Sequence, residues 1–121
     1  MSAYVSEKLR RFVGERAGYC CEYCLIHEED TFFPFEIDHI ISLKHGGDSK
    51  AENLAYSCIV CNRNKGSDVG SVLLPGRKFI RLYNPRIDSW PDHFKLDDLR
   101  IEPTSEIGQV TVKLLDLNSL E

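Results

Sequence analysis

The chain has 121 residues and a net charge of −4; 42% of its residues are hydrophobic and 28% are charged. This balance is typical of a globular chain and excludes a disordered one, and the length predicts a single domain over residues 1–121. No apolar run approaches the roughly 18 residues that cross a membrane. We therefore expect a cytoplasmic protein without a membrane partner, and the oligomeric state stays open.

Charge is distributed unevenly along the chain. Residues 38–87 carry eight Lys and Arg against four Asp and Glu, whereas the segments before and after them are acidic. An acidic chain argues against a protein that binds polyanions with its whole surface, because clustered Lys and Arg dominate phosphate affinity. The basic middle segment is still able to dock locally on a nucleic-acid backbone.

The first half of the chain predicts a helix, two strands and a second, short helix. Residues 5–17 have helical periodicity, with Ser6 as the N-cap. Residues 32–41 are rich in aromatic and β-branched side chains and predict a strand, with Pro34 near its start or on an edge. A loop, a short strand and a short helix ended by Gly66 follow, over residues 42–52, 54–57 and 58–65.

The second half predicts a supporting extension over about residues 77–118. It contains a strand over residues 78–83, a hairpin over residues 93–101 and a final helix capped by Thr104 or Ser105. Together, these short strands and helices predict a small α+β fold.

Four of the five cysteines form two Cys-x-x-Cys pairs, Cys21 with Cys24 and Cys58 with Cys61. Thiolates at this spacing in a tight turn converge on one ion, and four of them satisfy the tetrahedral preference of Zn²⁺ with no open position. The pattern therefore predicts a structural zinc that stabilises a small core. Ordinary buried thiols and a redox pair are the alternatives, although redox chemistry needs one pair and not two. Cys20 is an alternative to Cys21 as a ligand.

The segment between and just after the cysteine pairs carries further polar residues in a characteristic order. They are Asp38-His39 in the predicted strand, Asn53-Leu54 after a Gly-Gly loop, and Asn62-Arg63 directly after the last cysteine. Together with the interleaved cysteines, this arrangement over residues 20–67 resembles the HNH endonuclease family, the zinc-stabilised members of the ββα-metal nucleases. The resemblance implies a ββα-metal core over residues 20–67, with an N-terminal helix and the C-terminal extension around it.

Hydrolysis of a phosphodiester needs an activated water and stabilisation of the charge that develops on the phosphate. Histidine is the natural base near neutral pH, so a neutral His39 is able to take a proton from water. A divalent cation on the scissile phosphate stabilises the developing charge and the leaving oxygen. Such hard cations prefer oxygen ligands, and Asp38 and Asn62 offer a carboxylate and an amide oxygen.

The resemblance assigns roles to four residues. It implies His39 as the general base, Asp38 and Asn62 as ligands of one catalytic Mg²⁺ or Mn²⁺, and Asn53 as a brace of the loop that orients His39. The strict family pattern has His where this chain has Asn62, and an amide favours hard metals over softer ones. Adjacent residues of a regular strand point to opposite faces, so the resemblance places Asp38-His39 near the end of its strand, where the backbone turns.

The sequence thus predicts a metal-dependent endonuclease acting on DNA, with phosphate contacts from Lys44, Arg63 and Lys65, which flank the proposed site. The first alternative is a catalytically inactive, zinc-stabilised module that binds nucleic acid. The second is a structural or protein-binding zinc domain, favoured only by the acidic flanks. The inactive module explains the cysteines and the basic middle equally well, but it leaves the co-occurrence of Asp38, His39, Asn53 and Asn62 to chance.

Overall fold

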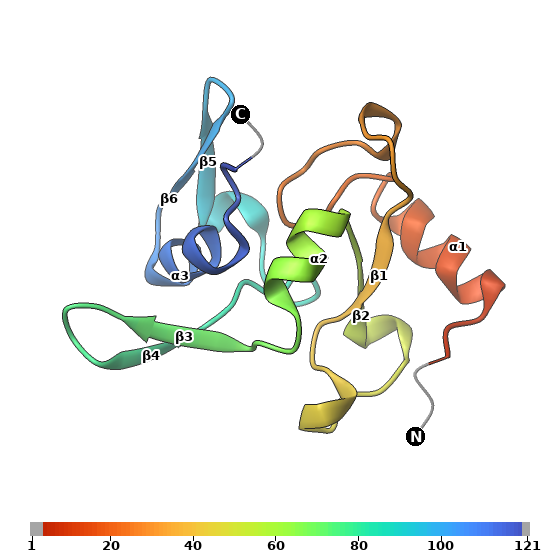
Figure 1. Cartoon of the computed structure of the whole chain (residues 1–121), viewed down its shortest axis with the longest axis horizontal. Coiled ribbons are helices and arrows are strands. Elements are labelled where there is room, and N and C mark those ends of the chain that lie inside the picture. The colour runs from red at the N-terminus through yellow and green to blue at the C-terminus, as the bar shows by residue number, and fades with distance from the viewer. Residues whose placement is uncertain (1–3, 120–121) are drawn as a thin grey trace.

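The computed structural model describes residues 4–119, which form three α-helices and three two-stranded antiparallel sheets (Figure 1). The α+β fold class predicted from the sequence is confirmed. In chain order the elements are α1 (Glu7–Arg16), β1 (Glu36–His39), β2 (Leu54–Ser57), α2 (Ile59–Lys65), β3 (Gly70–Leu73), β4 (Lys78–Arg81), β5 (Phe94–Asp97), β6 (Arg100–Pro103) and α3 (Glu106–Leu115). Across residues 4–119 no helix has both the length and the apolar character needed to span a bilayer.

β1 and β2 form an antiparallel hairpin, whose register pairs His39 with Leu54 at the end next to the connecting loop. The helix α1 packs against β2 and α2 packs against β1, so the hairpin lies between the two helices (Figure 1). The guanidinium of Arg16, at the end of α1, donates to the carbonyl oxygens of Ala51 at 3.0 Å and Leu54 at 2.7 Å. These bonds fix α1 to the segment where β2 begins.

The strand β1 is shorter than the sequence predicts, because its first expected residues bond elsewhere. Pro34 has no N–H to donate to a ladder, and the N–H of Phe35 donates to the Glu28 carboxylate at 2.8 Å. Phe33, in the first part of the predicted strand, is 63% exposed. The prediction of a strand over residues 32–41 is therefore confirmed only for β1 itself.

The ends of the helices match their local signals. Ser6 accepts a hydrogen bond from the N–H of Leu9 at 3.1 Å, and Ser105 accepts one from the N–H of Gly108 at 2.9 Å. After α2 the chain turns at Gly66 with a φ of 51°, a conformation that residues with a Cβ rarely adopt. Capping is a local property, which is why the sequence located the helices well.

The C-terminal half contains the two hairpins β3–β4 and β5–β6, and α3 packs against both (Figure 1). The strand β3 is absent from the sequence prediction, which begins the extension only after it. The predicted strand over residues 78–83 ends at Arg81 as β4, since the N–H of Tyr83 donates to the Thr111 hydroxyl of α3 at 2.9 Å. The predicted hairpin and final helix are present as β5–β6 and α3.

The C-terminal half packs directly on the turn that carries the first cysteine pair. The indole N–H of Trp90 donates to the carbonyl oxygen of Tyr23 at 3.0 Å, and Arg86 forms an ion pair with Glu22. The rings of Tyr23 and Tyr83 meet edge to face, with centroids 6.4 Å apart and an interplanar angle of 82°. The extension therefore supports the segment from which the candidate site is built.

Candidate functional site

The four cysteines of the two predicted pairs meet at one point. Their Sγ atoms all lie within 4.8 Å of one another, and those of Cys24 and Cys58 are 3.8 Å apart. Four sulfurs about 2.3 Å from one Zn²⁺ in a tetrahedron lie about 3.8 Å from each other. The donor set is therefore compatible with zinc. Within the described part of the chain the cluster contains Cys21 and not Cys20.

The two cysteine turns have the same local geometry. The N–H of Cys24 is directed at the Sγ of Cys21 at 3.5 Å, and the N–H of Cys61 at the Sγ of Cys58 at 3.4 Å, where Cys58 is also the N-cap of α2. Hydrogen bonds from Cys21 and Cys24 lower the pKa of the Cys58 thiol. Thiolates this close together repel one another, so a bound cation is needed to balance their charge.

Asp38, in β1, is buried and has both carboxylate oxygens held by neighbouring side chains. The hydroxyl of Tyr23 donates to Oδ2 at 2.7 Å, and the ammonium of Lys65 lies 3.2 Å from Oδ1. The same ammonium donates to the carbonyl oxygens of His39 at 3.1 Å and Ile40 at 3.0 Å. The buried ammonium of Lys65 therefore fixes both the Asp38 carboxylate and the backbone at the point where β1 ends.

The protonation of these groups follows from their burial. Burial raises the pKa of Tyr23 well above its ordinary value, and the nearby Asp38 carboxylate raises it further. Burial also raises the pKa of Asp38, whereas Lys65 and the hydrogen bond from Tyr23 act in the opposite direction. The Tyr23 hydroxyl therefore remains a donor, and the ion pair with Lys65 compensates part of the cost of burying the carboxylate.

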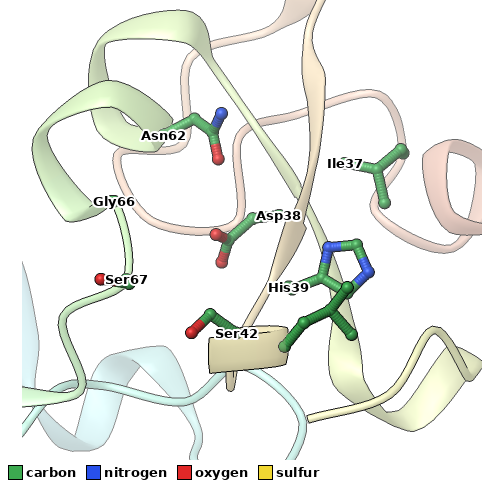
Figure 2. A pocket seen from close by; sticks show the side chains of 8 residues that line it. Ile37, Asp38, His39, Ser42, Asn62, Gly66 and Ser67 are labelled. Atoms are coloured by element: carbon green, nitrogen blue, oxygen red, sulfur yellow. The ribbon is translucent and has the colours of Figure 1, made fainter. Parts of the chain in front are cut away.

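His39 follows Asp38 and is the last residue of β1. Its Nε2 lies 3.0 Å from the Ser49 hydroxyl. Figure 2 shows the Asp38 carboxylate and the His39 imidazole on opposite sides of the strand, as strand alternation requires. Both residues nevertheless line one pocket of about 300 Å³, because the strand ends here and the backbone turns away.

Asn62, in α2, lines the same pocket (Figure 2). Its amide points towards the Asp38 carboxylate and forms no hydrogen bond with any other side chain or backbone group of residues 4–119. The hydroxyl oxygen of Ser42, another lining residue, is buried without a partner among those residues. A carboxylate, an unpartnered amide and an unpartnered hydroxyl form a polar pocket whose oxygen donors suit a hard cation.

Asn53 closes the loop that follows β1. Its amide oxygen accepts the N–H of Ile41 at 2.9 Å, and its amide nitrogen donates to the carbonyl oxygens of Ile41 at 2.8 Å and Asp48 at 2.7 Å. Gly47 makes the close approach of this loop possible, since a Cβ there would lie 1.7 Å from the carbonyl oxygen of Ile41. The loop that carries Ser49 is thus tied to the start of β2.

The three predicted nucleic-acid contacts lie in different environments. Lys65 is 2% exposed and its ammonium is held by Asp38 and two carbonyl groups, so the prediction that it contacts nucleic acid is wrong. Lys44 is exposed on a 3₁₀ turn (η2, Leu43–His45) beside the pocket. Arg63 is exposed on α2, and lines a separate groove with Phe33 and Val60.

Three side chains of the site escape prediction from the sequence: Tyr23, Ser42 and Ser49. Ser42 and Ser49 belong to a loop whose path local patterns do not determine. Tyr23 carries one usable signal, its place between two predicted zinc ligands, which already suggests a fixed side chain close to the core. Nothing in the sequence indicates that its hydroxyl meets Asp38.

A comparison with known proteins finds one family over this part of the chain. A family model described as HNH endonuclease matches residues 21–68, the segment that holds the four cysteines together with Asp38, His39, Asn53 and Asn62. No curated protein and no solved structure matches the chain significantly. Proteins with this domain are in general endonucleases that act on nucleic acid with divalent metals. Residues 21–68, called the HNH segment below, therefore carry the match to the HNH endonuclease domain, and they make up less than half of the chain.

Proposed function

We propose that this chain is a metal-dependent endonuclease that hydrolyses DNA phosphodiester bonds. The observation that carries the proposal is the meeting of Asp38, His39 and Asn62 at one polar pocket inside the segment matched to the HNH family. These residues come from β1 and α2, and only the fold brings them together. A module that merely binds nucleic acid has no need of that combination.

Asp38 and Asn62 would hold one Mg²⁺ or Mn²⁺. Both offer oxygen, the donor that hard cations prefer, and the amide of Asn62 has no competing partner among residues 4–119. The ion supplies, when bound, stabilisation of the negative charge that develops on the phosphate and on the leaving oxygen. Lys65 holds the carboxylate from inside the fold while Asn62 faces it across the pocket.

His39 would take the proton of the attacking water. In the tautomer whose Nε2–H donates to Ser49, the Nδ1 atom keeps its lone pair and is the base. Asn53 supports this arrangement through its bond to the carbonyl oxygen of Asp48, the residue before Ser49. Because the nucleophile is water and not a ribose hydroxyl, the mechanism suits DNA.

The exposed side chains of Lys44 and Arg63 would contact the phosphates of the DNA.

One observation favours the inactive nucleic-acid-binding module as a second candidate. Both oxygens of Asp38 already have partners, and the ammonium of Lys65 neutralises the carboxylate. A carboxylate in this state is stable without a divalent ion. The two functions therefore differ in whether the remaining lone pairs of Asp38 bind a metal.

Incubation of supercoiled plasmid with the purified protein separates the two candidates. With Mg²⁺ we expect conversion to nicked or linear DNA, no conversion with EDTA, and a rate at least about 10²-fold lower for His39→Ala, since general-base catalysis contributes about 10²–10⁴-fold. His93→Ala, which removes a histidine of the extension, should leave the rate within about twofold when measured well below its Tm. Absence of metal-dependent cleavage by the unchanged protein, or equal cleavage by His39→Ala, would refute the proposal.

A further inference from the structure

We propose that Tyr23 is a positioning residue for the metal-binding carboxylate, through which the zinc site and the C-terminal extension hold Asp38 in place. The inference rests on the proposed function, since it concerns the same pocket. Its starting point is the 2.7 Å hydrogen bond from the Tyr23 hydroxyl to Oδ2 of Asp38. Tyr23 and Asp38 are 15 positions apart in the sequence, so the fold brings them together.

The hydroxyl of Tyr23 and the ammonium of Lys65 hold Asp38 from two directions. Lys65 contacts Oδ1 and Tyr23 contacts Oδ2, so rotation of the carboxylate breaks at least one bond. Each carboxylate oxygen has two lone pairs, which leaves both oxygens with capacity for a ligand on the pocket side. Tyr23 is 1% exposed, so water cannot readily replace its hydroxyl, and a buried hydroxyl without a partner is costly.

Tyr23 is itself fixed from two sides. It lies between the zinc-cluster residues Cys21 and Cys24, so the backbone around it takes its shape from the metal site. On the other side, Trp90 donates to its carbonyl oxygen at 3.0 Å and the ring of Tyr83 packs edge-on against its own. A displacement of either the zinc turn or the extension therefore moves the hydroxyl that holds Asp38.

The consequence is that the zinc and the extension contribute to metal binding in the pocket as well as to folding. Groups that orient a metal ligand from behind are worth about 10–100-fold in metal affinity or activity. Removal of the Tyr23 hydroxyl alone should therefore weaken divalent-ion binding while the fold persists. The ring, which carries the packing against Tyr83, is left unchanged by phenylalanine.

Tyr56→Phe is a matched control for Tyr23→Phe. Tyr56 is also buried, and its hydroxyl also donates to a carboxylate at 2.7 Å, that of Glu28, outside the pocket. Calorimetry with Mn²⁺ on the full chain without DNA should show binding about tenfold weaker for Tyr23→Phe, and within about twofold of the unchanged protein for Tyr56→Phe. The Mg²⁺ concentration for half-maximal plasmid cleavage should shift in parallel, with zinc content unchanged.

Equal Mn²⁺ affinity of Tyr23→Phe and the unchanged protein would overturn the inference, and so would an equal loss in both tyrosine variants. If the unchanged protein binds Mn²⁺ without cleaving DNA, the proposed function fails while the calorimetric comparison still decides the role of Tyr23. If it binds no Mn²⁺, both fail. If the Tyr23→Phe protein loses its zinc, Trp90→Phe is the variant to test instead. Loss of the hydrogen bond from Trp90 to Tyr23 should weaken Mn²⁺ binding about two- to fivefold. Unchanged Mn²⁺ binding by Trp90→Phe would contradict the inference.

Discussion

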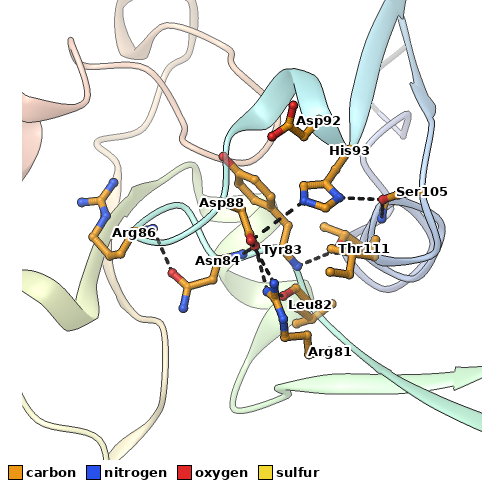
Figure 3. A network of polar contacts seen from close by, with 12 residues as sticks. Arg81, Leu82, Tyr83, Asn84, Arg86, Asp88, Asp92, His93, Ser105 and Thr111 are labelled. Atoms are coloured by element: carbon orange, nitrogen blue, oxygen red, sulfur yellow. Dashed lines mark hydrogen bonds and ion pairs between the residues drawn. The ribbon is translucent and has the colours of Figure 1, made fainter.

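The HNH segment and the C-terminal extension each bring an aspartate close to a histidine, with different results. In the extension, Arg81 donates two hydrogen bonds to Asp88, at 2.8 and 2.9 Å, and Nδ1 of His93 lies 2.7 Å from the Ser105 hydroxyl (Figure 3). The order of Asp88, His93 and Ser105 resembles that of a hydrolytic triad. In the HNH segment, the side chains of Asp38 and His39 lie on opposite sides of β1, and both residues line one pocket.

The difference lies in which polar groups are already satisfied. In the extension, Nε2 of His93 is 3.9 Å from Asp88, which is too far for a hydrogen bond, and the Ser105 hydroxyl accepts the N–H of Gly108 as a helix cap. Its polar groups are used to join β4, β5 and α3. In the HNH segment, Asn62 and Ser42 keep unpartnered polar atoms at the pocket. Residue types alone therefore do not define a site; unsatisfied groups around a pocket do.

Only the HNH segment contains the cysteine cluster, and substitutions there should have the largest effect. The same change, cysteine to serine, inside and outside the cluster tests this. Cys58→Ser should lose zinc and lower the Tm by at least about 10 °C, because metal-binding free energy is folding free energy in such sites. Serine is a good N-cap, so the loss does not come from the cap of α2. Cys20→Ser, outside the cluster, should keep its zinc and change the Tm by about 2 °C or less. Metal analysis and circular dichroism melting measure both, and equal zinc content would contradict the assignment.

The parts of the fold that the sequence predicts well depend on local or self-contained signals. Ser6 and Gly66 mark helix ends through hydrogen bonds within one turn, and the cysteine pairs share one requirement, a common ion. Strands depend on a partner elsewhere in the chain. The sequence therefore predicts a start of β1 that is too early, since the N–H of Phe35 donates to Glu28 there. It does not predict β3, because the strand character of β3 comes from pairing with β4.

Two asparagines of the same helix, α2, have different surroundings. Asn62 faces the pocket, whereas Asn64 donates to the carbonyl oxygen of Leu115 at 2.9 Å and so joins α2 to α3. Asn62→Ala should lower plasmid cleavage by about 10²-fold without changing the Tm, because no hydrogen bond within residues 4–119 is lost. Asn64→Ala should lower the Tm by about 3–5 °C, the effect of about 1 kcal/mol, and keep cleavage. The reverse pattern would contradict the assignment of Asn62.

Four polar residues of the proposed site can be selected from the sequence because they stand in a characteristic order between and just after the cysteine pairs. Their partners cannot. Lys65 lies in a basic segment and lysine is mostly exposed, so the sequence predicts a surface role. In the structure, three oxygen acceptors surround its ammonium inside the fold. The bond between Tyr23 and Asp38 joins side chains 15 positions apart. Such contacts depend on how the turn, the hairpin and α2 pack together.

Substitution of two glycines tests a crowded loop beside the site against the open turn between β3 and β4. At Gly47 a Cβ would lie 1.7 Å from the carbonyl oxygen of Ile41, whereas at Gly76 the nearest atom, the carbonyl oxygen of Leu73, is 3.8 Å away. Gly47→Ala should cost about 1–3 kcal/mol, or about 4–10 °C in Tm, and also lower cleavage because the loop next to His39 moves. Gly76→Ala should change neither. A folded, fully active Gly47→Ala protein would show that the loop of the site tolerates displacement.

The smallest effect is expected from Asp88, and it depends on pH. Hydrogen bonds from Arg81 hold the pKa of this carboxyl below its ordinary value of 3.8. The fold therefore favours the carboxylate, so its contribution to stability is present above about pH 4 and disappears as the pH falls through the lowered pKa. At pH 5–7, Asp88→Asn should melt about 2–4 °C below the unchanged protein, since partly exposed ion pairs contribute at most about 1 kcal/mol. Melting curves from pH 7 down to pH 2.5 should show this gap closing, and plasmid cleavage at pH 7 should be unaffected. A gap that stays constant to pH 2.5, or a large loss of cleavage, would mean that Asp88 has a role beyond joining the strands and helix of the extension.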